Sequence, residues 1–253
     1  IMLDSNLYSL DDSTSQPTTA GKIRASTLNW LEKQLQEAKE KKQKVLIFTH
    51  HNVFKHNPLV YQGFVLNNTE EVQKLLQKYH VPVIFSGHIH AQDIMTENKM
   101  TEIVTSSYGI IDHGYGELTL SKDKLNYERK TISVSTWAKE NKDLPSDLKE
   151  TLLNHDNYLE KLFYTDGERL AYQDLLDKGI YDKKILDPVA NLVAKGNVNY
   201  FKGADFLSDE EVANIKLENG YQLLKEHSEF LKEYVDFILQ DKNLPDQNFS
   251  YDY

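Results

Sequence analysis

Histidine side chains follow two apolar segments of the sequence, at the point where each segment ends. The segment V-L-I-F (45–48) is followed by T-H-H-N (49–52), and V-P-V-I-F (81–85) is followed by S-G-H-I-H (86–90). Neutral imidazole is a common ligand of zinc, iron and other transition metals. Two histidines separated by one residue can face one centre if the backbone bends, and Gly87 permits such a bend. We therefore predict a metal site formed by His50, His88 and His90.

The elements around these histidines predict how they are positioned. Residues 45–48 form an apolar run without polar alternation, which is typical of a strand buried on both faces of a parallel sheet. Apolar residues at helical spacing predict helices at 26–41 and 68–79, so strands and helices alternate up to residue 85. In an open α/β sheet of this kind, ligands bind at the carboxyl ends of the strands. We expect the three imidazoles to lie together at that edge.

The pattern changes after His90. Short strands at 101–106, 116–120 and 124–131 predict an antiparallel set, and apolar residues recur at helical spacing from about residue 133. We predict an α/β (α+β) domain over residues 1–134. An all-helical C-terminal domain of about five helices, including 146–164 and 168–177, is predicted over residues 135–253. The polar tail, residues 241–253, is expected to fray.

The composition excludes several classes of protein. The sequence has 29 Lys and Arg against 39 Asp and Glu, a formal net charge of −10, whereas nucleic-acid binding needs a basic surface. The absence of cysteine excludes disulfides and thiolate metal sites, and it suits an exported or a cytoplasmic bacterial protein. No apolar run approaches the ~18 residues of a membrane span. The opening Ile1-Met2-Leu3 is neither a start methionine nor a signal peptide, so we expect residue 1 to be an internal position of a longer protein.

The two histidine motifs carry a resemblance to a known family. T-H-H-N, followed about forty residues later by S-G-H-I-H, resembles the last two motifs of the calcineurin-like metallophosphoesterases. The strand and helix order between the motifs, and Y-G-E-L-T-L (115–120) after them, also fit that family. The helical C-terminal part is similar to a Gram-positive bacterial branch described as cyclic-nucleotide phosphodiesterase-like. The resemblance covers residues 1–132 closely and the helical part only loosely.

The resemblance implies a double-sheet sandwich covered by helices, with two divalent transition metals (Mn, Fe or Zn) at the strand ends. His50 would be the ligand of the fourth motif, and His50 and His88 would share one metal while His90 would bind the other. A hydroxide bridging the metals would attack the phosphorus of a small phosphoester, so no protein side chain is expected to act as the nucleophile. The resemblance to the helical branch suggests a cyclic nucleotide as that phosphoester. Beside these ligands, we predict that His51 and Asn52 contact the substrate.

The sequence departs from the family pattern in the first three motifs. D-x-H, G-D-x-x-D and G-N-H, which supply the carboxylate and Asn ligands, do not occur in these 253 residues. We therefore expect the chain to be the C-terminal portion of a catalytic domain, to need the N-terminal half as a partner, and to be inactive alone.

Two other interpretations stay open. A non-catalytic interaction protein could carry a vestigial or mononuclear histidine site beside its helical domain. An amidohydrolase would also carry H-x-H, but on the first strand of a barrel, whereas the pair comes late in this chain. Metal analysis, with hydrolysis of bis-p-nitrophenyl phosphate in the presence of the upstream polypeptide, separates the phosphoesterase from the interaction protein.

Overall fold

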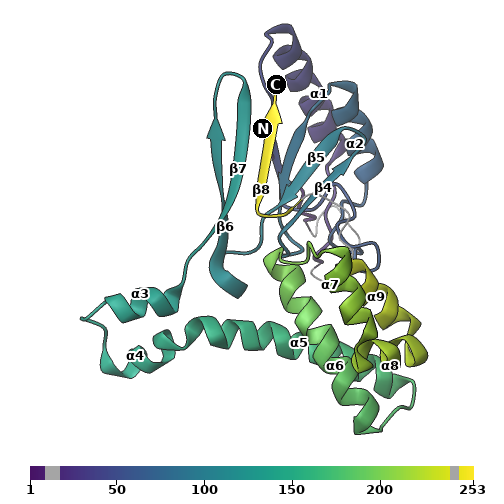
Figure 1. The fold of residues 1–253 in the computed structure, drawn as a ribbon. Helices are drawn as coiled ribbons and strands as arrows, with labels where there is room; N and C mark the ends of the chain where they lie inside the picture. Colours follow the sequence, from purple (N-terminus) through teal and green to yellow (C-terminus); the bar gives the residue numbers. More distant parts are fainter. Residues whose placement is uncertain (9–17, 240–244) are drawn as a thin grey trace. The chain divides into compact units, whose positions relative to one another are not determined.

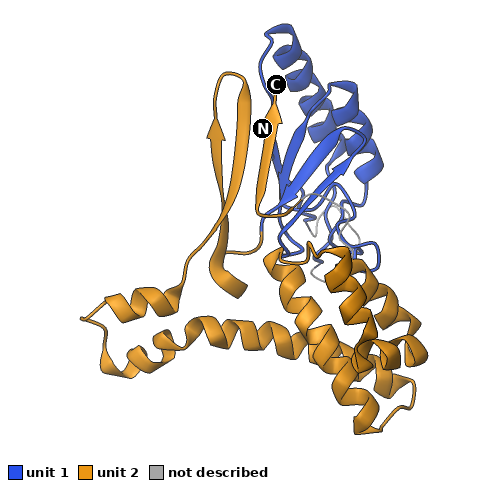
Figure 2. Ribbon diagram, viewed as in Figure 1, with its two compact units in different colours: residues 1–105 blue, residues 106–253 orange. Residues whose placement is uncertain are grey.

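A computed structural model describes residues 1–8, 18–239 and 245–253. The chain divides into two compact units, residues 1–105 and 106–253 (Figure 2). The helical part of the chain begins at Val134, inside the second unit. The two units meet between residues 105 and 106, after β5 of the first sheet. This division does not test the predicted domain boundary between residues 134 and 135, which stays a prediction.

The first unit is built on a mostly parallel sheet. Its strands lie in the order β1 (Met2–Leu3), β2 (Ile47–Thr49), β3 (Val83–Ser86), β5 (Met100–Val104) and β4 (Asp93–Glu97). All neighbours pair in parallel except β4, which is antiparallel to β5 at the edge. Two helices, α1 (Ala25–Glu40) and α2 (Thr69–Lys78), connect β1 to β2 and β2 to β3, as the periodicity predicts (Figure 1).

Apolar side chains of both helices pack in one core cluster with residues of the sheet. The cluster includes Leu31, Leu35, Val72, Leu76, Ile47 and Ile84. Each aliphatic side chain buried in this way contributes about 1.5–3 kcal/mol, so the cluster fixes the helices to the sheet. The pairing of Ile47 with Ile84 aligns β2 and β3, and the two strands end at the same edge. The core thus positions the segments that carry the histidines.

The second unit contains an antiparallel sheet of β6 (Gly114–Leu120), β7 (Lys124–Thr131) and β8 (Asn248–Asp252), with β7 in the centre. The prediction that residues 241–253 fray is wrong for β8, while residues 241–244 lie outside the described part of the chain. Phe249 and Tyr251 alternate with exposed residues in β8, which is the period of a strand covered on one face.

Two further sequence predictions about strands need correction. The strand predicted at 101–106 is β5, which pairs in parallel with β3 instead of joining the antiparallel set. The sequence analysis also missed β4, D-I-M-T-E, because its two apolar residues are adjacent and lie between charged ends. Antiparallel pairing of the two strands predicted at 116–120 and 124–131 is confirmed.

Helices make up most of the second unit. They are α3 (Val134–Glu140), α4 (Ser146–Leu153), α5 (His155–Asp177), α6 (Lys183–Lys202), α7 (Asp209–Leu217), α8 (Asn219–His227) and α9 (Glu229–Leu239), after a short 3₁₀ turn, η1 (Ile111–His113). The predicted fold class, an α/β part followed by a mostly helical part, is confirmed, except that β8 makes the second part not entirely helical. Among the described residues, no helix combines the length and the apolarity needed to cross a membrane.

The predicted helices 146–164 and 168–177 differ from the structure in their boundaries. The helix is interrupted at Asn154 instead, between α4 and α5, and α5 then continues without interruption through Gly167. A Cβ atom at Gly167 would lie 2.6 Å from Ala194 Cα in α6. The glycine therefore serves close packing of two helices, although glycine usually weakens a helix interior.

Candidate metal centre

His50 and His88 lie just after the ends of two neighbouring strands. Because β2 ends at Thr49 and β3 at Ser86, the two imidazoles leave the same edge of the sheet. Their ring centroids are 4.7 Å apart and the rings are tilted by 58°. The backbone N–H of Gly87 donates to the carbonyl oxygen of His50 at 3.1 Å, which ties the two turns together. The structure thus brings this pair together as the sequence predicts.

The G-H-I-H turn holds both of its histidines in an uncommon backbone conformation. His88 and His90 each have φ of 62°, in the left-handed region that glycine adopts more readily. Such conformations cost about 1–3 kcal/mol each and are concentrated at functional sites. Between them, the N–H of Ile89 donates to the carbonyl oxygen of Gly87 at 2.7 Å. The bend therefore lies at His88 and His90, one and three residues after Gly87, where the sequence predicts it.

A backbone carbonyl fixes the ring of His88. Its Nε2 lies 3.0 Å from the carbonyl oxygen of Gly63, and a carbonyl only accepts, so Nε2 carries the proton. Metal-binding histidines usually donate their second ring N–H to a carbonyl or carboxylate in this way. Because Nε2 carries the proton, Nδ1 is the ring nitrogen of His88 that could bind a metal.

The histidines fit part of a metal centre. Desolvation lowers the pKa of His50, and the nearby His88 and His90 lower it further. Desolvation and His88 likewise lower the pKa of His90. Lower pKa values favour the neutral imidazole, which is the form that binds metals. Within residues 1–8, 18–239 and 245–253, however, no three His, Asp or Glu side chains are arranged to hold one ion, so the donor set is incomplete.

The two residues predicted to contact substrate are both buried. Both ring nitrogens of His51 are engaged: Ser5 Oγ lies 2.8 Å from Nδ1, and Nε2 donates to the carbonyl oxygen of Thr19 at 2.8 Å. Asn52 Nδ2 donates to Ser86 Oγ, while its buried Oδ1 has no hydrogen-bond partner in the described part of the chain. His51 thus connects the segments of Ser5 and Thr19 to the end of β2. Contact of His51 and Asn52 with substrate stays a prediction.

The comparisons with known proteins agree with this geometry. Residues 2–92, which include both histidine turns, match the family model described as calcineurin-like phosphoesterase. This part of the chain is a calcineurin-like phosphoesterase domain. Residues 133–244 match a second family model, the C-terminal domain of cyclic nucleotide phosphodiesterase.

No curated protein matched the sequence of the whole chain. Among solved structures, a dimetal phosphatase from Danio rerio is similar at 21% sequence identity and a TM-score of 0.40. The similarity covers 44% of this chain and 36% of that one, so the chain spans about a third of the phosphatase. A calcineurin-like phosphoesterase domain implies divalent metal ions, and the histidines described above fit such ions in part.

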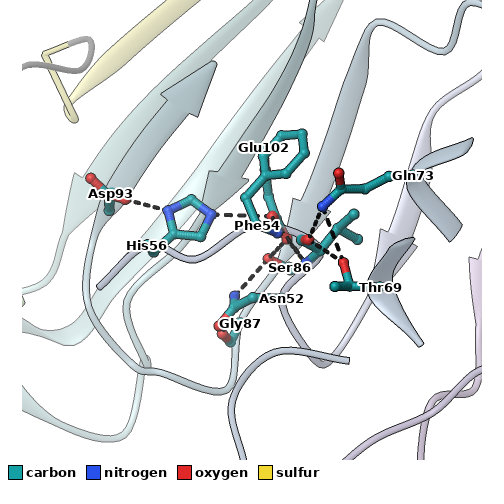
Figure 3. A network of polar contacts seen from close by, with 10 residues as sticks. Asn52, Phe54, His56, Thr69, Gln73, Ser86, Gly87, Asp93 and Glu102 are labelled. Carbon is teal, nitrogen blue, oxygen red and sulfur yellow. Dashed lines mark hydrogen bonds and ion pairs between the residues drawn. The ribbon is translucent and has the colours of Figure 1, made fainter. Parts of the chain in front are cut away.

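The first unit also contains a buried charged network that the sequence analysis missed (Figure 3). His56 lies between two carboxylates: its Nδ1 donates to Asp93, and its Nε2 is 3.2 Å from Glu102. Burial lowers the pKa of His56, but Asp93 and Glu102 outweigh burial and raise the pKa to about 10. A signal was present in the sequence, because Glu102 is the charged residue of the buried strand M-T-E-I-V.

A cavity of about 520 Å³ lies within the first unit. It is lined by the loop after His56 and the first turn of α2, including Tyr61, Gly63, Asn67 and Glu71. Gly63 belongs to this lining and also accepts the hydrogen bond from His88.

Proposed function

We propose that this chain is part of a metal-dependent hydrolase that cleaves small phosphoesters. The observation that carries the proposal is the close approach of His50 and His88, with ring centroids 4.7 Å apart, at the strand ends of a calcineurin-like phosphoesterase domain. The ends of parallel strands are where open α/β sheets bind ligands.

The proposed ligands are His50 and His88 for one divalent ion and His90 for a second, with Mn, Fe or Zn as the metals. His88 would bind through Nδ1, since Nε2 donates to Gly63. Metals held in this way lower the pKa of a bound water and neutralise charge that develops on the phosphate. The carboxylate and Asn ligands of the family pattern would come from outside these 253 residues, as a polypeptide partner.

Substrate binding is the second part of the proposal. Phosphodiesters are the proposed substrate class, and cyclic nucleotides are suggested by the match of residues 133–244. The cavity beside His88 is proposed to receive the organic group of the ester, because Gly63 borders both. Nucleic acid is not among the proposed partners, given the net charge of −10.

A non-catalytic interaction protein with a vestigial or mononuclear site is the alternative. The observation that favours it is the incomplete donor set among the described residues. The two proposals differ in what the chain does when the missing ligands are supplied.

The test combines the chain with an upstream polypeptide that carries D-x-H, G-D-x-x-D and G-N-H. We expect bound divalent metal and hydrolysis of bis-p-nitrophenyl phosphate, with both lost to a large extent in His50→Ala and His88→Ala. His80→Asn is the matched control, because His80 is exposed, lies outside the site, and has a positive φ that Asn tolerates. Metal binding without hydrolysis would favour the interaction protein. Unchanged metal binding in both alanine variants would refute the assignment of the ligands.

A further inference from the structure

We infer that the buried Glu102 is a positioning residue that holds the two histidine turns in one geometry. The turns are residues 49–54 and 86–90, and Glu102 lies on neither of them but on β5. The side chain of Glu102 is fully buried. The effect of Glu102 on metal binding rests on the proposed function, whereas its effect on the backbone of the two turns does not depend on that function.

Glu102 binds the backbone of the first turn directly. The N–H of Val53 donates to Oε1 at 2.8 Å and to Oε2 at 3.0 Å, and the N–H of Phe54 donates to Oε2 at 2.5 Å. The carbonyl oxygen of Val53 is engaged as well, since it accepts from Thr69 Oγ1 and from Gln73 Nε2 of α2. The turn that follows His50 is thus held between the carboxylate on one side and the helix on the other (Figure 3).

The second turn is reached through two polar side chains. Ser86 Oγ donates to Glu102 Oε1 at 2.5 Å and accepts from Asn52 Nδ2 at 2.9 Å. Asn52 Nδ2 also donates to the carbonyl oxygen of Gly87 at 3.0 Å, and Gly87 immediately precedes His88. One carboxylate therefore connects the chain after His50 with the chain before His88.

The charge of Glu102 suits this role. The hydrogen bonds to Glu102 all come from donors, which are two backbone N–H groups and the Ser86 hydroxyl. The ring of His56 forms an ion pair with the same carboxylate at 3.2 Å. An ionised carboxylate only accepts, so it can satisfy all of them, whereas a glutamine would present an amide N–H₂ to at least one donor. His56, itself paired with Asp93, supplies the positive charge that compensates for burial of the carboxylate.

A pair of substitutions tests the inference on the whole chain. Glu102→Gln keeps the volume of the side chain and removes one acceptor, so we expect amide hydrogen exchange at Val53 and Phe54 to rise at least tenfold. Substitution of residues that orient metal ligands typically lowers metal affinity about 10- to 100-fold. We expect calorimetry to show a loss of Zn²⁺ affinity of that size in Glu102→Gln. Ser86→Ala removes only the connection to the second turn, so exchange should rise at Gly87 and not at Val53 or Phe54.

Leu35→Ala is the control for a general loss of stability. Leu35 is buried in the apolar core, on α1, and takes part in none of the hydrogen bonds of Glu102 given above. This variant should lower the unfolding temperature without changing Zn²⁺ affinity or selectively exposing the turn amides. If Leu35→Ala reproduces both effects of Glu102→Gln, or if Glu102→Gln changes neither, the inference is overturned.

The two measurements, Zn²⁺ binding and amide hydrogen exchange, also test this inference separately from the proposed function. If the wild-type chain binds no Zn²⁺ even with the upstream polypeptide, the proposed function fails. The exchange of Val53, Phe54 and Gly87 still decides whether Glu102 holds the turns.

Discussion

Two kinds of histidine occur in the phosphoesterase domain, and their surroundings separate them. His50 and His90 are exposed at the strand ends, and their pKa values are lowered. His56 is fully buried between Asp93 and Glu102, and its pKa is raised to about 10. Neutral imidazoles suit metal binding, whereas a buried imidazolium suits a structural ion pair. Burial and neighbouring charge, and not residue type, thus assign these roles.

The raised pKa of His56 predicts how stability depends on pH. Because the folded pKa, about 10, lies above the value of about 6.5 in the unfolded chain, protonation of His56 favours the folded state. This contribution is fully present below about pH 6.5 and is lost progressively as the pH rises towards 10. Denaturant unfolding at pH 6, 8 and 9.5 should show the free energy of unfolding of the wild type falling over this range.

His56→Gln should flatten that dependence and lower stability at pH 6 by about 3–5 kcal/mol, since it leaves buried carboxylates without a cation. His80→Asn, at an exposed position, should leave the wild-type dependence in place. A wild type whose stability is constant between pH 6 and 9.5 would show that His56 is not charged in the folded protein.

At the scale of elements, helix packing in the second unit depends on glycine at one contact between α5 and α6. A Cβ atom at Gly167 would meet backbone, 2.6 Å from Ala194 Cα. At Gly196 of α6, a Cβ atom would instead meet Ile238 Cδ1, also at 2.6 Å, which is the far end of a flexible side chain. The distances are equal, but the ability of the neighbour to move differs.

We predict opposite outcomes for alanine at these two helix positions. Gly167→Ala should lower the free energy of unfolding by about 1–3 kcal/mol, because overpacking forces the two helix backbones apart. Gly196→Ala should be close to neutral, because movement of Ile238 is offset by the helix propensity of alanine, up to about 1 kcal/mol. Urea unfolding measures both. Equal effects would mean that α5 and α6 do not pack in solution as described.

At the scale of the whole molecule, the sheet of the second unit joins distant parts of the chain. β8 pairs with β7, and the N–H of Arg129 donates to the carbonyl oxygen of Gln247 at 2.8 Å. Gln247 Nε2 donates to the carbonyl oxygens of Lys202 and Gly203, at the end of α6. The last residues of the chain therefore complete the sheet and also cap a helix.

Removal of residues 247–253 should damage the protein more than the loss of a terminal tail would. β7 would lose one of its two partner strands and expose an unpaired edge, which promotes association with other chains. We expect a lower unfolding temperature and larger particles by light scattering. Truncation after residue 136 should expose the same edge, so activity lost in that variant could not be assigned to the helices alone. A truncated chain with the size distribution and unfolding temperature of the wild type would contradict this role of β8.

The sequence by itself determined the local features of the site. Apolar runs ending in T-H-H-N and S-G-H-I-H placed His50 and His88 at strand ends, because burial of a strand and the spacing of its apolar residues are written in adjacent positions. The order of strands and helices from β1 to β3 followed for the same reason. These features depend on neighbours within a few residues, which a sequence displays directly.

Only the tertiary structure decided what holds the site together. Glu102 lies 49 positions from Val53, and Ser250 Oγ donates to Asn126 Oδ1 across 124 positions, so no local pattern announces either contact. A buried carboxylate and a polar C-terminal strand both resemble surface residues in the sequence. Their roles depend on which groups the fold brings opposite them: backbone donors and His56 for Glu102, and the open edge of β7 for β8.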